Sequence, residues 1–209
     1  MMAGQRILGV VVVAALTVGL SGCLPGPPSG TDGSEALIEP IEFPEPVAAE
    51  GGLALAFGDP VWVELKSSSS EYLVGVAVLD IIEGDVTYWK NFTNPEEFLG
   101  YTPSFVIVQR AYRSTDEMFD ITLWPIYDDG TDAYLMTTDV NGAGEDLASC
   151  NHLTLAQPDD PLQRIDCFVV TADTGRAIAG VRYDSTDPFT SEVPVGNRYF
   201  DAPITWTAG

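Results

Sequence analysis

The sequence predicts an all-β protein, an antiparallel sandwich that follows an export signal and a proline-rich acidic segment. From Gly58 onward, short apolar or alternating runs are separated by turn residues, and no long stripe with a 3.6-residue period interrupts them. The chain has 209 residues, of which 45% are hydrophobic, so it can bury one sizeable core. We therefore divide it into a signal at 1–22, a tether at 23–56 and one domain at 57–209.

Nine short runs are predicted strands, and their number favours a sandwich. The run Tyr72–Leu79 is apolar on both faces, as in a central strand. Between Ala177 and Tyr183 apolar residues alternate with others, and Ile178 breaks that alternation. The predicted strands are Val61–Leu65, Glu71–Ile82, Ser104–Tyr112, Phe119–Ile126, Ala133–Thr138, Leu147–Leu155, Gln163–Thr171, Ala177–Tyr183 and Asn197–Trp206.

Turn residues separate these runs. Hairpins are predicted at Asp128-Asp129-Gly130, Asn141-Gly142 and Asp173-Thr174-Gly175, because each stretch contains a residue that tolerates positive φ between two β runs. The stretch Asn94–Leu99 predicts one helical turn within a long connection.

The first 22 residues have the anatomy of a signal peptide. A short polar start ends at Arg6, and the following apolar run, Ile7–Leu20, holds about 14 residues, fewer than the roughly 20 that span a bilayer. The stretch Leu20-Ser21-Gly22-Cys23 then resembles the bacterial lipoprotein box. The resemblance implies cleavage before Cys23, a diacylglyceryl thioether on its sulfur and an acyl chain such as palmitate on the new amino terminus. We therefore expect a lipid anchor in the cell membrane, on its extracytoplasmic face.

The segment after the lipobox predicts a disordered tether. It is rich in proline, glycine and acidic residues, and no Lys or Arg occurs between Cys23 and Lys66. Such a composition keeps a chain extended and self-repelling. The piece Leu37–Phe43 is more apolar and could dock on the domain as an edge strand, which Pro40 disfavours.

The charge excludes one class of partner. Nine Lys and Arg stand against 31 Asp and Glu, a net charge of −22. A phosphate backbone is bound by clustered cations, and no basic run occurs, so we expect no nucleic-acid partner.

The cysteines divide into one anchor and one pair. Once Cys23 is assigned to the lipid, Cys150 and Cys167 remain as two cysteines of an exported domain, where disulfides form. We predict a bridge between them that closes a loop of about 18 residues and stabilises the fold by roughly 3 kcal/mol.

Four stretches between Phe57 and Trp206 carry a resemblance to a known family. They are Phe57–Val63, the run from Tyr72, the Asp128-Asp129-Gly130 turn, and the Cys150–Cys167 segment continuing to Tyr183. Their order resembles actinobacterial secreted antigens and lipoproteins with a telokin-like, immunoglobulin-like sandwich. The resemblance implies that fold and a role outside the cell in binding or host contact, and it brings no catalytic residues. The close spacing of the two cysteines departs from antibody domains, so we expect their bridge to link neighbouring strands or to close a loop.

Residues that could carry chemistry are few. The sole histidine is His152, and the predicted disulfide removes the nearby Cys150 thiol as a nucleophile. A zinc site would need three or four His and Cys ligands, more than His152 and Cys150 supply. We therefore expect no enzyme and no cofactor, although the many carboxylates leave a hydrolase with an acid pair as an alternative.

Two acidic turns offer oxygen ligands for calcium. One consists of Asp139, Asn141, Glu145 and Asp146 with glycines between them, and it lacks both the full loop spacing and the glutamate at position twelve. The other is Asp128–Asp132. The simpler interpretation of both is a solvated turn, without a metal.

One group of aromatic residues lies in a long connection instead of an alternating strand. Aromatic side chains supply a large contact area at low entropic cost, and loops often carry binding residues. We therefore predict a binding loop made of Tyr88, Trp89, Phe92, Phe98 and Tyr101.

These inferences predict a lipid-anchored, non-catalytic module that binds or adheres to a protein or cell-envelope ligand. An accessory structural lipoprotein of a membrane complex is the second interpretation, and the hydrolase is the third.

The lipobox generates the first prediction. We expect Cys23→Ser to release the protein from the membrane fraction or to block its processing, because the serine hydroxyl cannot form the thioether. Fractionation of cells that express either form measures this, with Ser21→Ala as the matched control. Membrane retention of Cys23→Ser at the level of the parent chain would contradict the lipid anchor.

Overall fold

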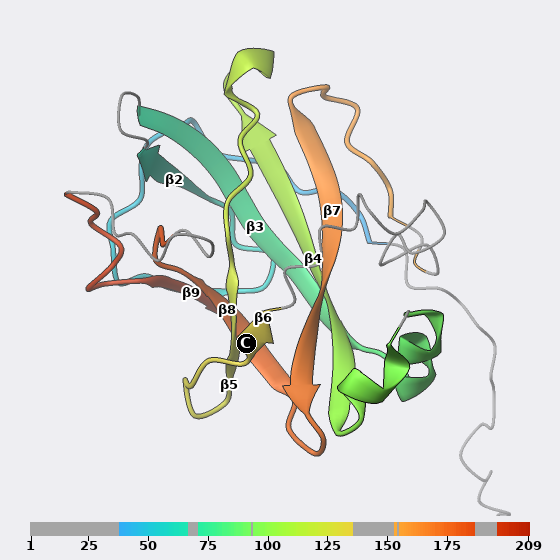
Figure 1. Ribbon diagram of the computed structural model, residues 1–209. Helices are drawn as coiled ribbons and strands as arrows, with labels where there is room; N and C mark the ends of the chain where they lie inside the picture. The colour runs from blue at the N-terminus through green and yellow to red at the C-terminus, as the bar shows by residue number, and fades with distance from the viewer. Residues whose placement is uncertain (1–37, 67–70, 93, 136–152, 154, 187–195) are drawn as a thin grey trace, which may run out of the picture. The chain divides into compact units, whose positions relative to one another are not determined.

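Two β-sheets pack face to face around one hydrophobic core (Figure 1). In this computed structural model the described residues are 38–66, 71–92, 94–135, 153, 155–186 and 196–209, all within one compact unit that runs from Glu35 to Gly209. The five-stranded sheet has the order β2 (Val61–Lys66), β3 (Glu71–Glu83), β4 (Tyr101–Tyr112), β7 (Gln163–Asp173), β6 (Tyr134–Leu135). The four-stranded sheet has the order β1 (Ala54–Ala56), β9 (Ile204–Thr207), β8 (Ile178–Tyr183), β5 (Trp124–Tyr127). The predicted all-β sandwich is thus confirmed.

The core lies between the inner faces of the two sheets. Valines of β3 and β4 meet Val181 of β8 and Trp206 of β9, all fully buried. Antiparallel pairing predominates among the strands. β1 pairs in parallel with β9, and single parallel bridges join Ile38 to Leu155 and Ala48 to Trp62. The run predicted as a central strand is β3, which pairs with β2 on one side and β4 on the other.

Two β-bulges adjust the alternation of side chains. In β8 the register moves from Gly180 to Ile178 opposite β5, so Ala179 is the extra residue. This bulge turns Ile178 into the core beside Val181, which explains why Ile178 breaks the alternation in the sequence. In β3 the extra residue is Leu79, between Val78 and Asp80.

Several predicted elements differ from the structure. The ladder of β5 starts only at Trp124, because Ile121 and Leu123 enter the core from a segment without strand pairing. Likewise, β9 begins at Ile204, later than predicted, and β1 was not predicted. Most of the predicted strand 147–155 and the Asn141-Gly142 turn lie outside the described residues.

Two predicted hairpin turns form, but each carries the chain from one sheet to the other. At 128–130 a short hairpin does form: Gly130 has φ +78°, the Tyr127 N–H donates to the Thr131 carbonyl at 2.9 Å, and Ile126 bridges Asp132 in antiparallel fashion. Beyond this bridge the chain leaves β5, and β6 pairs in the other sheet. Gly175, with φ +86°, turns the chain between β7 and β8 in the same way. The turn residues therefore indicated a reversal correctly, whereas the pairing of the next strand is decided by the core.

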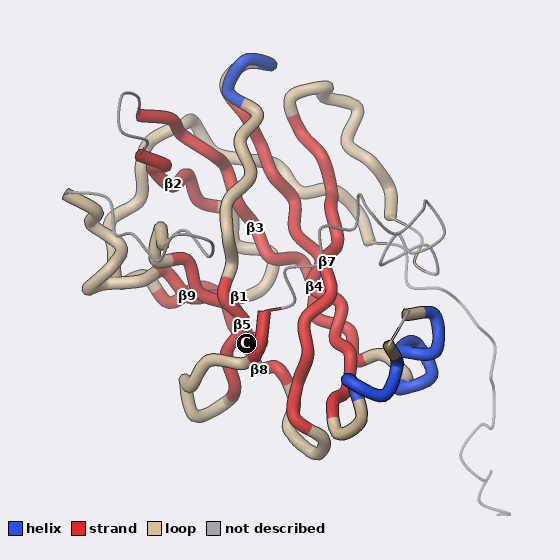
Figure 2. Tube along the Cα trace, viewed as in Figure 1, coloured by secondary structure: helices blue, strands red, loops and turns tan. Residues whose placement is uncertain are grey.

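The connection from β3 to β4 contains two 3-10 helices, η1 (Val86–Asn91) and η2 (Pro95–Phe98), and a third, η3 (Thr115–Glu117), follows β4 (Figure 2). The helical turn predicted near Asn94–Leu99 is η2. In the described ranges, no helix has the length and apolar character needed to cross a membrane.

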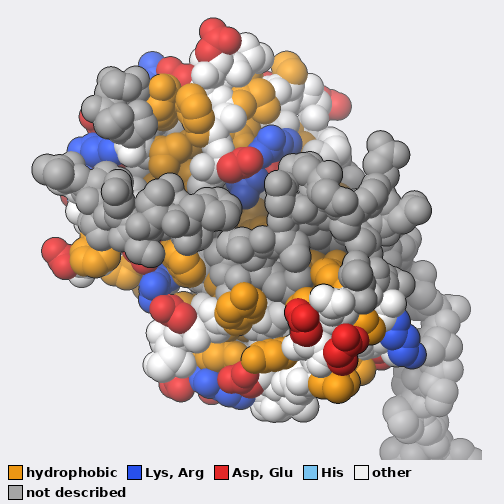
Figure 3. Space-filling view, viewed as in Figure 1, with side chains coloured by type: hydrophobic (Ala, Val, Ile, Leu, Met, Phe, Trp, Pro, Cys, Tyr) orange, Lys and Arg blue, Asp and Glu red, His pale blue; other side chains and the backbone are white. Residues whose placement is uncertain are grey.

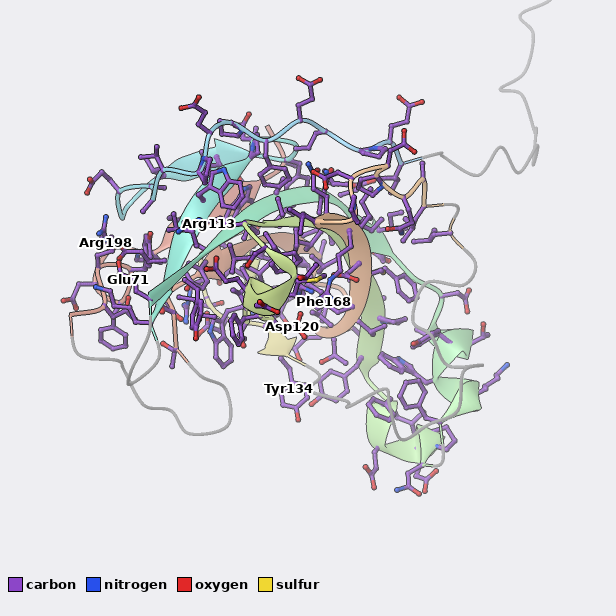
Figure 4. All side chains as sticks on the ribbon, turned by 90° about the horizontal axis from the view of Figure 1, so that it is seen from above. Glu71, Arg113, Asp120, Tyr134, Phe168 and Arg198 are labelled. Atoms are coloured by element: carbon purple, nitrogen blue, oxygen red, sulfur yellow. The ribbon has the colours of Figure 1, made fainter. Side chains whose placement is uncertain are left out.

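The predicted tether, residues 23–56, includes residues that belong to the folded domain. Residues 38–49, which we call the strap, lie on the outer face of the five-stranded sheet, and β1 follows them. In Figure 4 the strap is the pale blue segment that crosses the outside of the sheet. Ile41 and Phe43 are half-buried while Glu42 is exposed, so alternate side chains dock without forming the edge strand that we considered.

Two buried tyrosines join the sheets at one end of the core. The Tyr183 hydroxyl of β8 donates to the Glu64 carbonyl of β2 at 2.8 Å, and the Glu64 N–H donates to the Tyr199 hydroxyl at 3.1 Å. Tyr199 in turn donates to the Ala49 carbonyl at 3.1 Å. Burial raises the pKa of both phenols above the ordinary value of 10.0.

The raised pKa values predict a loss of stability at alkaline pH. Unfolded tyrosine ionises near pH 10 while the buried phenols stay neutral, so stability is full below that pH and falls as pH rises above it, by up to about 1.4 kcal/mol per pH unit for each phenol. We expect Tyr183→Phe to cost about 1 kcal/mol at neutral pH through the lost hydrogen bond and to reduce the alkaline slope. Denaturant unfolding from neutral to alkaline pH measures both effects. Tyr134→Phe, at an exposed ring, is the control, and an unchanged slope in Tyr183→Phe would contradict the assignment.

Candidate functional site

Four of the five predicted binding aromatics, Tyr88, Trp89, Phe92 and Phe98, come together in the structure at one end of the five-stranded sheet, and Tyr101 is joined to them through its carbonyl, which accepts from Trp89. Tyr88 and Trp89 belong to η1, Phe98 to η2, and Tyr101 begins β4. Asp85 begins η1 by accepting a hydrogen bond from the Thr87 N–H at 2.7 Å, and this bond holds the pKa of Asp85 below its usual value. Pro95 at the start of η2 has the fixed φ that a helical first turn requires.

Most of these rings contact one another instead of solvent. Trp89 stacks on Phe98 with ring centroids 4.6 Å apart, and Tyr88 meets Phe105 edge to face at 5.2 Å. Trp89 is only 4% exposed, and its indole N–H donates to the Tyr101 carbonyl at 3.0 Å. The cluster packs on Phe105 and Val169, so it is a second, smaller core on the outer face of the sheet. The Trp89 ring therefore has no free face for a ligand.

The surface available for binding at this end is the rim of that cluster. Leu99 is 79% exposed, Val86 is 55% exposed, and Tyr101 is 37% exposed. We call these three residues the rim. The sequence analysis did not include Leu99 and Val86 among the binding residues. The available signal was Gly100, which follows Leu99 and whose φ of +97° makes the turn into β4, because a residue beside such a turn is often exposed. Figure 3 shows hydrophobic side chains interspersed with acidic ones on this end of the molecule.

A further exposed aromatic residue lies on the edge strand β6. Tyr134 is 66% exposed and pairs opposite Thr171 of β7. Figure 4 shows its side chain pointing away from the sheets.

An Arg–Asp network brings two carboxylates, those of Asp120 and Asp166, onto the same arginines. One guanidinium nitrogen of Arg110 lies 3.2 Å from Asp120 and 2.8 Å from Asp166. Arg164 contacts both of the same carboxylates, and its guanidinium lies 5.5 Å from the Tyr112 ring centroid. A glycosidase needs a substrate oxygen between its two acids, and here the Arg110 side chain fills that space.

The acidic turn at 128–132 is held by arginines. Asp129 accepts from the Thr131 N–H at 2.9 Å and pairs with Arg176 at 2.9 Å, while Asp132 contacts Arg182. The hydrogen bonds from Thr131 hold the pKa of Asp129 below its usual value. The carboxylates of Asp129 and Asp132 therefore have cationic partners within the protein, which favours the turn over a calcium site. In the described ranges no cluster of three or more metal-binding side chains occurs.

The other predicted site residues lie outside the part of the chain that the structure describes. They are Cys23, Cys150, His152 and the calcium candidate Asp139, Asn141, Glu145 and Asp146. Cys167 is half-buried on β7, beside the small core on the outer face. The lipid anchor and the disulfide therefore stay predictions.

Comparison of the chain with protein-family models, with curated proteins and with solved structures gives no match in any of the three. Conclusions about function therefore depend on the residues themselves.

The packing of the aromatic cluster predicts losses of stability of very different size for two substitutions. Trp89→Ala should lower the free energy of unfolding by about 3–5 kcal/mol, because it empties the centre of the small core. Tyr101→Ala should cost less than about 1 kcal/mol, because the ring is partly exposed and the carbonyl that accepts from Trp89 belongs to the backbone. Urea unfolding measures both. Equal losses would mean that the rim is also part of the core.

Proposed function

We propose that the protein is a non-catalytic extracytoplasmic module, held to the cell membrane by lipid on Cys23, that binds a protein or cell-envelope ligand through its sandwich domain. The location is supported by Leu20-Ser21-Gly22-Cys23 at the end of a signal-like segment. The binding role is supported by the rim, whose side chains are exposed at the end of the sheet where Trp89 and its neighbours form the small core. Exposed apolar residues on an ordered loop are typical of recognition surfaces.

The disulfide between Cys150 and Cys167 belongs to the same proposal. Cys167 and Leu153, which follows Cys150 by three positions in the sequence, both pack on the small core. An exported domain is also in the compartment where such bridges form.

An accessory role in a membrane complex is the second candidate. It is favoured by the same exposed apolar residues, because subunits of stable complexes contact one another through apolar surface. It differs from the first candidate in its partner, which would be one membrane protein in a fixed ratio.

Site-specific photo-crosslinking on intact cells tests the binding role. A photoreactive residue at Leu99 should give crosslinks, while the same residue at Asp201, exposed on the loop before β9, should give none. Mass spectrometry then identifies the captured molecule. Crosslinking at Asp201 equal to that at Leu99 would contradict the rim as the binding surface. Recovery of one stoichiometric membrane partner from a detergent extract would favour the accessory role, and recovery of none would exclude it.

A further inference from the structure

The residues of the rim stand where two neighbouring strands leave the sheet. The Gly84 N–H, just after β3, donates to the Pro103 carbonyl of β4 at 2.8 Å. Val86 lies two positions beyond Gly84, and Tyr101 lies two positions before Pro103. With Leu99 two positions earlier in the chain, these residues bring exposed apolar surface to one end of the domain.

An acidic residue accompanies each residue of the rim. Asp85 directly precedes the first of them, and Asp173, at the end of β7, pairs opposite Tyr101. The Glu96 carbonyl accepts from the Leu99 N–H at 3.4 Å. All three acidic residues are exposed, and we call them the acidic border.

The protein's own cations do not neutralise this border. Among the described residues, no ion pair involves any of its three carboxylates. Lys90 of η1 is exposed and makes no ion pair with them. Arg176, which follows β7, is turned away: its guanidinium pairs with Asp129 at 2.9 Å and lies 3.4 Å from the Tyr127 ring centroid. The negative charge of the border is therefore available to a partner.

We propose that the rim and its acidic border bind a cationic segment of a partner protein, in which Lys or Arg side chains flank apolar ones. The proposal rests on the proposed binding function and names the chemistry of the partner. Apolar side chains of the segment cover Leu99, Val86 and Tyr101, while its cations face the three carboxylates. Protein interfaces combine an apolar centre with a polar surround, and opposite charges speed association and reject partners of the wrong sign.

The position of the charge distinguishes this proposal from a general attraction. The net charge of −22 draws cations to the whole surface, but charges more than about 8 Å apart are largely screened at physiological ionic strength. Glu42 and Glu45 are exposed on the strap, whose Ile41 is bonded to Gln109. Gln109 lies eight residues along β4 from Tyr101, about 26 Å at the rise of a strand. These two glutamates are therefore a matched control for the border.

Photo-crosslinking of synthetic peptides to the full-length chain in detergent tests the proposal. The chain carries a photoreactive apolar residue at Leu99, and the probe is a labelled peptide of repeated Lys-Leu-Lys-Gly. A second peptide has Glu in place of every Lys. We expect the Lys peptide to crosslink, less at high salt, and the Glu peptide to give no crosslink.

Two double variants then locate the charge that matters. Glu96→Gln with Asp173→Asn should raise the peptide concentration for half-maximal crosslinking about fivefold, because each exposed ion pair contributes modestly. Glu42→Gln with Glu45→Gln removes the same charge from the strap and should change that concentration less than about twofold. Equal effects of the two double variants, no crosslinking of the Lys peptide, or crosslinking of the Glu peptide at the same level would overturn the proposal.

The border variant on intact cells separates this proposal from the function on which it rests. We expect Glu96→Gln with Asp173→Asn to reduce the Leu99 crosslinks to the natural partner. Crosslinks that persist at the parental level would overturn the cationic partner and leave the rim as the binding surface. Absence of Leu99 crosslinks in the parent chain would overturn both.

Discussion

Burial of β4 on both of its faces is the constraint on which the rest of the structure depends. Val106 and Val108 point into the core between the sheets, while Phe105 and Gln109 point to the outer face, and all four are at most 2% exposed. A sandwich of two sheets covers only the inner face. The outer face is covered by the aromatic cluster at the Phe105 end and by the strap at the Gln109 end. Both segments are therefore needed to bury the outer face of β4, whether or not they also bind a ligand.

The sequence predicts the strands well where a signal is local. Alternation and turn residues located β2, β3, β7 and β8, and even the departure at Ile178 marks a real bulge. The sequence predicts poorly the two segments that cover the outer face, the strap and the aromatic cluster, because the residues they contact are distant in the chain. Ile41 is bonded to a glutamine 68 positions away, and a proline-rich acidic composition is typical of a tether whether or not such a partner exists. Gln109, a polar residue within an apolar strand, was the available sign that a backbone segment forms hydrogen bonds there.

The aromatic loop was identified for a sound reason, and the structure packs most of its rings on the sheet. Clustered rings in a long connection indicate that they pack on something, and the composition does not distinguish a ligand from the protein's own sheet. The outer face at Phe105 and Val169 supplies the apolar partner within the chain. What remains for recognition are the side chains that this packing leaves outside, and their exposure follows from the path of η1 and η2, which no local pattern encodes.

The strap also decides how the predicted anchor acts on the domain. A pull on Cys23 would reach the folded unit first at the strap and only then at the sheets, because β1 follows the strap in the chain. The contacts of Ile41, Phe43 and Ala49 with the sheet and with Tyr199 lie one after another along it, so they would yield in sequence. The next contact is the Gly52 N–H, which donates to the Ala202 carbonyl at 2.8 Å and fixes the chain before β1. Release of the strap would uncover the Gln109 end of β4 and leave the aromatic cluster in place. In the proposed lipid-anchored form, the strap is therefore the part of the domain that the anchor loads first, whereas the aromatic cluster is not on that path.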